Sequence, residues 1–281
     1  MSGLRGRGGA GFPTGSKWAT VRGGTGTHKY VVCNAAEGEP GTFKDRSILR
    51  ANPYQVVEGI AIAAEAMGAR DAFVAIKERF APERELITLA IEDMQAAGLA
   101  GDIPITVVSG PDEYLFGEEK ALLEVVEGRP PLPRMLPPFE HGLFATAPQL
   151  GWEASEPEPG HQGLHQSNPT LVNNVETLAN VAHILANGAE WFRRFGTRQS
   201  PGSIVCTVVG DVRRSGVGEV EMGTSLADVI ERLGGGVWPG RRVKAVFSGV
   251  ANPVLTAAAL ATPLTYEDMR AAGSGLGAAG F

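Results

Sequence analysis

Cysteine is scarce in this sequence of 281 residues, which contains two, Cys33 and Cys206. Two thiols exclude a small scaffold held by several disulfides, and they exclude a metal site built from four thiolates. They also exclude an iron–sulfur cluster with four cysteine ligands supplied by these residues alone. This low cysteine content favours a reducing compartment.

Long apolar runs are missing as well. A membrane-spanning helix needs about 18 or more consecutive apolar residues, and the best stretch, 56–67, is interrupted by Glu58 and Glu65. The first residues, MSGLRGRGG, are glycine-rich and basic and lack the apolar centre of a signal peptide. We therefore expect a cytoplasmic protein without a membrane span of its own, and no nucleic-acid partner.

Acidic residues are absent from residues 1–36, although the net charge of the chain is −6. The same stretch holds nine glycines and five basic residues: Arg5, Arg7, Lys17, Arg22 and Lys29. A basic, glycine-rich segment in an acidic protein predicts a local anion site, most simply for a phosphate. The alternative is a flexible basic tail.

Glycine and proline are abundant, with 38 and 19 residues, but 43% of the chain is apolar. This composition excludes a disordered or collagen-like chain, because enough apolar surface is available to form a buried core. The length suits one large domain or two smaller ones.

Strand and helix signals alternate over the first half of the chain. Strands are predicted at 30–35, 72–76 and 103–108, and helices at 53–67, 82–97, 117–127 and 174–186. Such alternation is typical of βαβ units and predicts an α/β protein with a mainly parallel sheet. The proline-rich stretch 130–138 should be an extended connector, and 149–167 a surface loop.

The pattern changes after residue 203. Strands are predicted at 204–209, 218–222 and 243–247, with a helix at 225–233 between the second and the third. A β-β-α-β order over about 50 residues is typical of a small separate module with a β-grasp-like fold. We expect a first domain over 1–198, the β-grasp module over 199–256 and a C-terminal segment over 257–281.

The first motif, GRGGAGFPTGSKW, covers residues 6–18. Closely spaced glycines let backbone N–H groups approach phosphate oxygens, and Lys17 adds a positive charge. The motif is neither a dinucleotide fingerprint nor a P-loop. Phe12 beside such a loop could stack on a base or a flavin ring.

The second motif, NAAEGEPGTFKDR, covers residues 34–46 and directly follows a predicted strand, where open α/β sheets bind ligands. Asn34 could hydrogen-bond a heterocycle, and Glu37 and Glu39 could bind ribose hydroxyls. The alternative is a solvated turn followed by an ordinary charged helix start.

The third and fourth motifs are YLFGEEK at 114–120 and NPTLVNNVET at 168–177. Both also have structural interpretations. Glu118 and Glu119 could simply stabilise the positive end of a helix, and Asn173 and Asn174 could cap one.

In this order, the four motifs resemble the 51 kDa FMN- and NADH-binding subunit of respiratory NADH:quinone oxidoreductase (complex I), also known by the letter F. Similar diaphorase modules occur in NAD-reducing hydrogenases and NAD-dependent formate dehydrogenases. The resemblance extends from Leu4 to Phe281. It implies a Rossmann-like FMN domain followed by a β-grasp domain of the ubiquitin-like SLBB type. It also implies an NADH dehydrogenase in which FMN takes a hydride from NADH and passes single electrons to iron–sulfur clusters.

The resemblance also implies the site residues. Those that would surround FMN are Gly6, Arg7, Gly8, Gly9, Lys17, Asn34, Glu37, Tyr114, Gly117, Glu118, Asn173, Asn174 and Thr177. Those that would contact NADH are Phe12, Glu39, Glu119 and Phe139. No catalytic acid–base residue and no metal ligand are expected, because the flavin performs the redox chemistry. The implied partners are iron–sulfur subunits similar to the E and G subunits of complex I, in an assembly at the cytoplasmic face of a membrane.

Some residues depart from the family pattern. Ala36 replaces a carboxylate in N-A-D-E, Phe116 replaces the usual Cys, Leu136 stands where Lys is frequent, and Thr20 where an aromatic is frequent. The family's four-cysteine region for a 4Fe–4S cluster has no counterpart, which favours a fragment over a variant that uses a partner's cluster.

Two other functions stay open at this point. One is a flavin-free scaffold that binds a partner or ligand through the β-grasp module, a hypothesis that Ala36 favours. The other is a flavin reductase that uses ferredoxin or NADPH. The final electron acceptor, the preference for NADH or NADPH, and the oligomeric state are not determined by the sequence.

Overall fold

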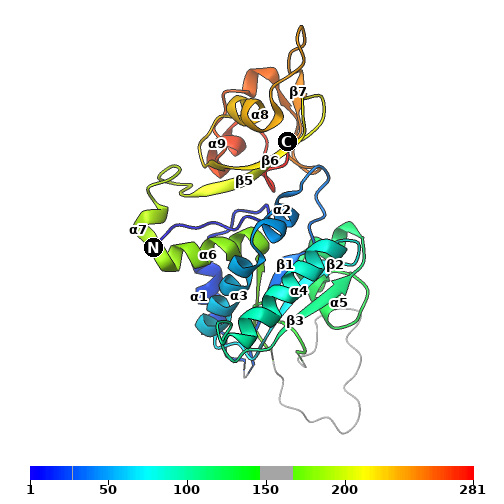
Figure 1. Cartoon of the computed structure of the whole chain (residues 1–281), viewed down its shortest axis with the longest axis vertical. Helices are drawn as coiled ribbons and strands as arrows, with labels where there is room; N and C mark the ends of the chain where they lie inside the picture. Colours follow the sequence, from blue (N-terminus) through cyan, green and yellow to red (C-terminus); the bar gives the residue numbers. More distant parts are fainter. Residues whose placement is uncertain (27, 146–166) are drawn as a thin grey trace. The chain divides into compact units, whose positions relative to one another are not determined.

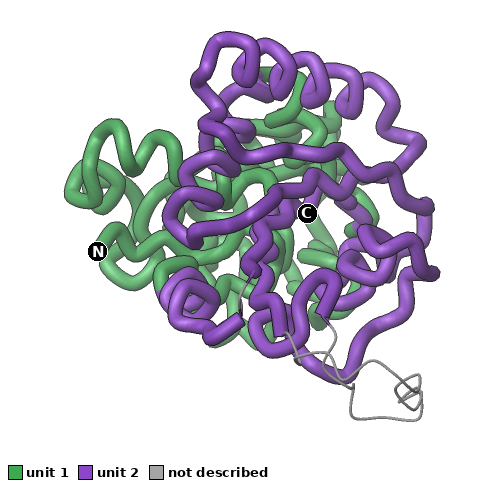
Figure 2. Tube along the Cα trace, turned by 90° about the horizontal axis from the view of Figure 1, so that it is seen from below, with its two compact units in different colours: residues 1–15, 39–51, 175–281 green, residues 16–38, 52–174 purple. Residues whose placement is uncertain are grey.

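The computed structural model describes residues 1–26, 28–145 and 167–281, and it divides into two compact units (Figure 2). Unit 1 comprises residues 1–15, 39–51 and 175–281, and unit 2 comprises residues 16–38 and 52–174. Nearly all of the predicted surface loop 149–167 lies outside the described residues. The units join segments that are distant in sequence, and the predicted domain limits near residues 198 and 256 stay a prediction.

Unit 2 is built on a four-stranded sheet of β1 (Tyr30–Ala35), β2 (Asp71–Lys77), β3 (Ile105–Gly110) and β4 (Thr170–Asn174), in the order β3-β2-β1-β4 (Figure 1). All three strand pairs are parallel. The predicted α/β class with a mainly parallel sheet is therefore confirmed.

The helices of unit 2 follow from local sequence signals. Helix α3 (Pro53–Met67) begins at the cap Asn52, whose side chain accepts a hydrogen bond from Gln55 N, and ends at Gly68 with φ of 62°. These are the start and stop that an Asn-Pro pair and a left-handed glycine predict. The other helices are α1 (Thr14–Gly23), which begins in unit 1, α4 (Ala81–Ala96), η1 (Tyr114–Gly117) and α5 (Glu119–Val126).

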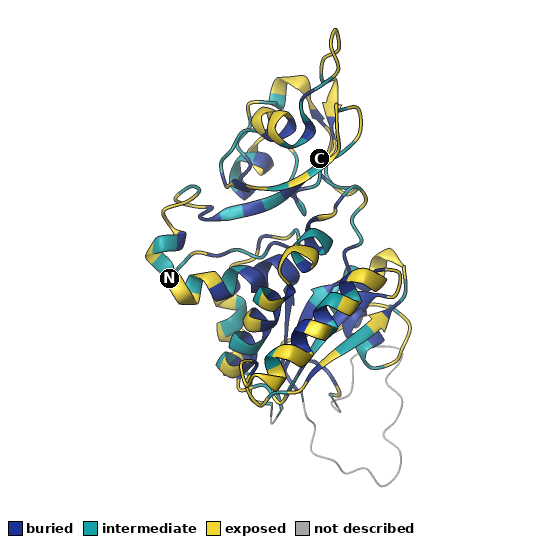
Figure 3. Cartoon of the chain, in the orientation of Figure 1, coloured by how far each residue is buried: buried dark blue, intermediate teal, exposed yellow. Residues whose placement is uncertain are grey.

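The two faces of the sheet bury different residues. Tyr30 and Val32 of β1 share a core cluster with Leu122 and Leu123 of α5, whereas helix α3 packs along β1 and β2. Side chains alternate along a strand, so Val31 and Cys33 point to the opposite face from Tyr30 and Val32. All four are buried (Figure 3). Buried strands of this kind are typical of parallel sheets that are covered on both faces.

Two elements of unit 2 differ from the sequence prediction. Helix α1 occupies the end of the glycine-rich motif, where no helix was expected, because its sequence TGSKWATVRG has no clear apolar stripe. Strand β4 contains Asn173 and Asn174, which the sequence presents as candidate helix caps. Its ladder with β1 satisfies the backbone of TLVNN as a strand, so tertiary pairing overrides the local cap preference.

Unit 1 contains the predicted hairpin and helix of the C-terminal part. Strands β5 (Ser203–Val208) and β6 (Gly216–Glu221) pair antiparallel, and α8 (Leu226–Gly234) follows. Ser225 caps α8 by accepting a hydrogen bond from Asp228 N at 3.1 Å, as its spacing predicts. The remaining elements are α2 (Lys44–Ala51), α6 (Val175–Asn187), α7 (Ala189–Phe192), β7 (Ala245–Val246), β8 (Leu255–Thr256), η2 (Ala257–Ala259) and α9 (Tyr266–Ala271).

One core cluster joins β5, α8, β7 and α9, with Cys206, Val229 and Met269 completely buried. The order of strands and helix agrees with the β-β-α-β prediction, and an independent β-grasp domain stays a prediction. No helix in the described part of the chain is long and apolar enough to cross a membrane.

Candidate functional site

The carboxyl ends of β1 and β4 form the first part of the candidate site, in unit 2. From β1 the chain proceeds to β2 and β3 on one side, and β4 lies on the other side of β1. The register pairs Cys33 with Asn173 and Asn34 with Asn174. In open α/β sheets, ligands bind at such a reversal of strand order, outside the carboxyl ends of the strands. Three of the predicted flavin residues therefore share this edge.

Asn34 connects the second and third motifs. Its Nδ2 donates to the Gly117 carbonyl at 2.8 Å, and its Oδ1 accepts from Ala36 N at 3.2 Å. A Cβ on Gly117 would lie 3.3 Å from the Ala36 carbonyl, so the two backbones approach closely. Asn34 thus fixes the turn before α5 against the end of β1, and its predicted contact with the flavin stays a prediction.

Glu118 and Glu119 have different roles at the start of α5. Glu118 caps the helix, because its Oε2 accepts hydrogen bonds from Lys120 N and Ala121 N, each at 2.9 Å. Glu119 instead forms an ion pair with Lys17. A residue predicted to hold FMN and one predicted to contact NADH, 102 positions apart, are therefore direct partners.

Trp18 is a residue of this edge to which the sequence analysis gave no role. Its Nε1 donates to Asn173 Oδ1 at 2.7 Å and so anchors helix α1 to the end of β4. The signal was its place in the first motif, directly after Lys17. Because Lys17 and Trp18 are neighbours on α1, the helix connects the first motif with the third through Glu119 and with the fourth through Asn173.

The other predicted residues of unit 2 differ in exposure. Glu37 is buried, whereas the rings of Tyr114 and Phe139 are 53% and 41% exposed. Ala36 is buried in the apolar cluster that includes Tyr30 and Val32. A carboxylate at position 36, as in the family pattern, would need a partner there, because burying an unpaired charge is costly.

The glycine-rich loop forms the second part of the candidate site, in unit 1. Residues 4–14 fold back on themselves: Gly6 N donates to the Phe12 carbonyl at 2.8 Å, and Thr14 N to the Leu4 carbonyl at 3.0 Å. Gly11 needs glycine because its φ is 63°. At Gly6 no such constraint exists, since a Cβ would approach no atom closer than 3.6 Å. Packing within the chain leaves this glycine unexplained, and the approach of a phosphate would explain it.

Arg7 is held inside unit 1. Its backbone N donates to Thr177 Oγ1 at 2.9 Å, so two predicted flavin residues meet. Its buried guanidinium donates to the carbonyls of Ser203 at 2.8 Å and Pro201 at 3.2 Å. The Arg7 side chain therefore fixes the loop to the start of β5, and its predicted contact with FMN stays a prediction.

Buried charges lie beneath the loop. Glu176 Oε2 is 3.0 Å from Lys44 Nζ, and Glu176 Oε1 is 4.0 Å from Arg7 Nε and accepts from Val205 N at 2.8 Å. Burial raises the pKa of Glu176, while the charges of Lys44 and Arg7 and the bond from Val205 oppose that rise. Burial likewise raises the pKa of Cys206, which keeps this thiol protonated and unreactive at neutral pH.

Two predicted NADH residues also lie in unit 1. The Phe12 ring is 56% exposed, as expected of a ring that could stack on a ligand. Glu39 Oε1 accepts a hydrogen bond from Val250 N at 2.6 Å and so holds a C-terminal loop.

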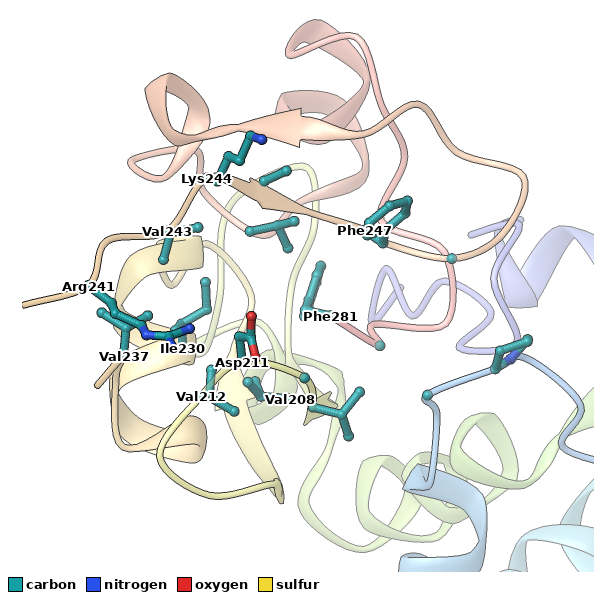
Figure 4. A pocket seen from close by; sticks show the side chains of 18 of the residues that line it. Val208, Asp211, Val212, Ile230, Val237, Arg241, Val243, Lys244, Phe247 and Phe281 are labelled. Atoms are coloured by element: carbon teal, nitrogen blue, oxygen red, sulfur yellow. The ribbon is translucent and has the colours of Figure 1, made fainter. Parts of the chain in front are cut away.

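A pocket of about 730 Å³ also lies in unit 1 (Figure 4). Val208, Ile230, Val243 and Phe281 are among its apolar lining residues, with Arg241 beside them. None of the residues predicted to bind FMN or NADH lines it, so it is separate from the candidate site.

Comparisons with known proteins agree with the motifs. A family model described as the Nuo51 FMN-binding domain matches residues 1–183. The chain belongs to this family. It is 42% identical to the second F subunit of the NADH-quinone oxidoreductase of Rhizobium meliloti, covering 99% of this chain and 64% of that protein. It is 38% identical to the corresponding NADH-quinone oxidoreductase protein of Aquifex aeolicus, covering 97% of this chain and 61% of that protein.

Hydrogenase proteins are similar too. The HndC protein of the NADP-reducing hydrogenase of Solidesulfovibrio fructosivorans is 38% identical, covering all of this chain and 55% of that protein. A chain of the NAD+-reducing NiFe hydrogenase in the air-oxidised state superposes with a TM-score of 0.82 at 35% identity, over 99% of this chain and 44% of that one. The chain therefore spans less than two thirds of the length of these relatives.

Proposed function

We propose that this chain binds FMN and forms the NADH-oxidising part of a larger redox protein. The observation that carries the proposal is the convergence at the edge of unit 2. The bonds from Lys17 to Glu119, from Asn34 to Gly117 and from Trp18 to Asn173 bring all four motifs to the reversal point of the sheet. The match to the Nuo51 FMN-binding domain supports FMN as the ligand.

The residues present suit the cofactor. The Asn34, Asn173 and Asn174 amides at the strand ends would hold the flavin, and Lys17 would supply positive charge for its phosphate. The glycine-rich loop is a further candidate for the phosphate, because Gly6 leaves room for an anion. When bound, FMN would take a hydride from NADH and release electrons one at a time to iron–sulfur clusters.

The chain itself would bind and orient. Phe12 and Phe139 present exposed rings on which the NADH base could stack, and Glu119 and Glu39 would contact the nicotinamide nucleotide. Glu119 also balances the charge of Lys17. We further propose iron–sulfur partners similar to the E and G subunits of complex I, because the two cysteines of this chain are buried and cannot ligate a cluster with four thiolates.

Titration with FMN tests the proposal. Purified protein should quench the fluorescence of added FMN saturably and become yellow, and NADH should bleach the flavin absorbance. Protein that takes up no FMN would instead support a flavin-free scaffold. Comparing bleaching by NADH and NADPH tests the nicotinamide preference, since the names of the relatives include both NAD and NADP.

A matched pair of lysine variants identifies the site. Lys17→Gln removes the charge that would face the phosphate and should weaken FMN binding about tenfold, which corresponds to about 1.4 kcal/mol. Lys120→Gln removes a lysine from the first turn of α5 and should change the FMN Kd less than about twofold, because only its backbone N is bonded at this edge. Equal effects of the two variants would contradict a specific role of Lys17.

A further inference from the structure

The glycine-rich loop is in contact with a residue far outside the matched family domain. Tyr266, at the start of α9, donates from its hydroxyl to the Gly6 carbonyl at 2.7 Å. Its ring lies against Gly11, where a Cβ would overlap the ring carbons at 2.4 Å. Tyr266 is 6% exposed, and both glycines belong to the same unit as the tyrosine. One buried side chain therefore touches both ends of the glycine-rich tip.

Arg5 and Glu267 complete the arrangement. The Arg5 guanidinium lies over the Tyr266 ring, 4.1 Å from its centre, and Arg5 Nε donates to the Gly11 carbonyl at 2.8 Å. Glu267 Oε2 lies 3.3 Å from Arg5 Nη1 and accepts from Ser200 Oγ at 2.8 Å. The loop backbone is thus held at Gly6 by a tyrosine and at Gly11 by an arginine, and the two side chains are stacked on each other.

This arrangement would control which backbone groups the loop can offer to a ligand. A glycine-rich tip without side-chain anchors samples many conformations, and a ligand that binds it must then bear the cost of ordering it. Because Gly6 and Gly11 are fixed, the intervening backbone is pre-ordered before any ligand arrives. The family model ends at residue 183, so nothing in that match assigns a role to Tyr266.

We propose that Tyr266 is a positioning residue for the flavin site: it holds the loop of residues 6–11 in the conformation that receives the FMN phosphate. The inference rests on the proposed function for its ligand, but the loop order itself is measurable without a cofactor. Tyr266 contacts the loop only, and we assign it no contact with FMN.

The experiment compares two matched tyrosine variants of the full chain. Tyr266→Phe keeps the ring and removes the bond to Gly6. Tyr54→Phe removes a similar bond, from an exposed hydroxyl to Asp93 Oδ2 at 2.7 Å, elsewhere in the chain. Amide hydrogen exchange of residues 6–12 is followed by mass spectrometry in the cofactor-free protein, and the FMN Kd is measured by fluorescence quenching. Far-UV circular dichroism checks the fold of each variant.

Tyr266→Phe should accelerate exchange in residues 6–12 and weaken FMN binding about fivefold, the effect expected of one lost buried hydrogen bond. Tyr54→Phe should leave both unchanged. Unchanged loop exchange in Tyr266→Phe would overturn the positioning role, and faster exchange with an unchanged Kd would overturn its link to FMN. Failure of the wild-type chain to bind FMN would overturn the proposed function and the link to FMN, while the exchange data would still report on the loop.

A second variant covers loss of the ring. Tyr266→Leu should accelerate loop exchange more than Tyr266→Phe, because Arg5 loses the surface on which it stacks. If this variant does not fold, the phenylalanine variant alone decides the result. An increase in exchange over the whole of unit 1, rather than in residues 6–12, would indicate a merely structural role and contradict the proposal.

Discussion

The two parts of the candidate site are held by different means. In unit 2, Asn34, Asn173 and Asn174 are placed by a parallel ladder of backbone hydrogen bonds between β1 and β4. In unit 1, the loop of residues 4–14 contains no helix or sheet of its own apart from the bridge between Arg5 and Pro13 and the first residue of α1. It is held by Thr177, Tyr266 and the buried guanidinium of Arg7.

The difference determines where each part is vulnerable. A strand end keeps its place when one side chain changes, because the ladder does not depend on side chains. A glycine-rich loop depends on a few side chains from distant positions, so single substitutions far away in sequence can alter it. Four substitutions test this contrast, beginning with the loop.

Removal of the buried carboxylate should have the largest effect. Glu176→Ala leaves the buried charges of Lys44 and Arg7 without their carboxylate, and the free energy of unfolding should fall by about 3–5 kcal/mol. Urea unfolding measures the change. Glu190→Ala, at an exposed glutamate of α7, is the control and should cost less than about 0.5 kcal/mol. A loss below about 1 kcal/mol for Glu176→Ala would show that the loop does not depend on these buried charges.

Substitution of Gly11 should follow. Gly11→Ala puts a Cβ at φ of 63° and into the Tyr266 ring, and we expect a loss of about 1–3 kcal/mol from backbone strain together with displacement of the ring. Gly15 is the matched control, because a Cβ there meets nothing within 4 Å and the residue lies in α1. Gly15→Ala should be neutral or stabilising by up to about 1 kcal/mol. Thermal unfolding of both variants tests the contrast.

Asn34→Ala should cost about 1–2 kcal/mol, because it removes the bonds to Gly117 and Ala36 but leaves the strand ladder intact. Chemical unfolding gives the value, and Asn187→Ala, at an exposed asparagine that bonds to the His183 carbonyl, should cost less than about 0.5 kcal/mol. A cost for Asn34→Ala as large as that of Glu176→Ala would contradict the view that the ladder protects this edge.

The ion pair at the sheet edge should matter least for stability. Glu119→Gln removes the partner of Lys17, but the Glu119 side chain is 43% exposed, so the loss should be below about 1 kcal/mol. It should disappear in about 1 M NaCl, because exposed charges are then screened. The measurement is a comparison of unfolding free energies at low and high salt. A loss that persists at high salt would indicate a packing role for Glu119.

Much of unit 2 is predictable because its signals are local. Asn52-Pro53 and Gly68 define both ends of α3, and the YVVCNA run of residues 30–35 coincides with β1. Strand β4 was not predicted, since TLVNN is short and ends in two residues that also suit a helix cap. Only its pairing with β1 selects the strand. The prediction that motif residues gather at strand ends agrees with Asn34, Asn173 and Asn174.

The predicted site residues divide in the same way. Glu118 had a flavin interpretation and a helix interpretation of equal weight, and its two bonds to backbone N–H groups supply the helix role. Arg7 carried a predicted flavin contact, yet its guanidinium is bonded to backbone carbonyls of unit 1. Trp18 and Tyr266 had no assigned role, because a hydrogen bond across 155 or 260 residues leaves no local pattern.

Residue types and their short-range spacing were enough to establish the α/β class, the four motifs and the family to which the chain belongs. Only folding paired β4 with β1, joined Lys17 to Glu119 and placed Tyr266 against Gly6 and Gly11. These contacts could not be read from the sequence because buried polar groups find their partners wherever the folded chain supplies them. Packing sets those partners, and distance along the sequence does not.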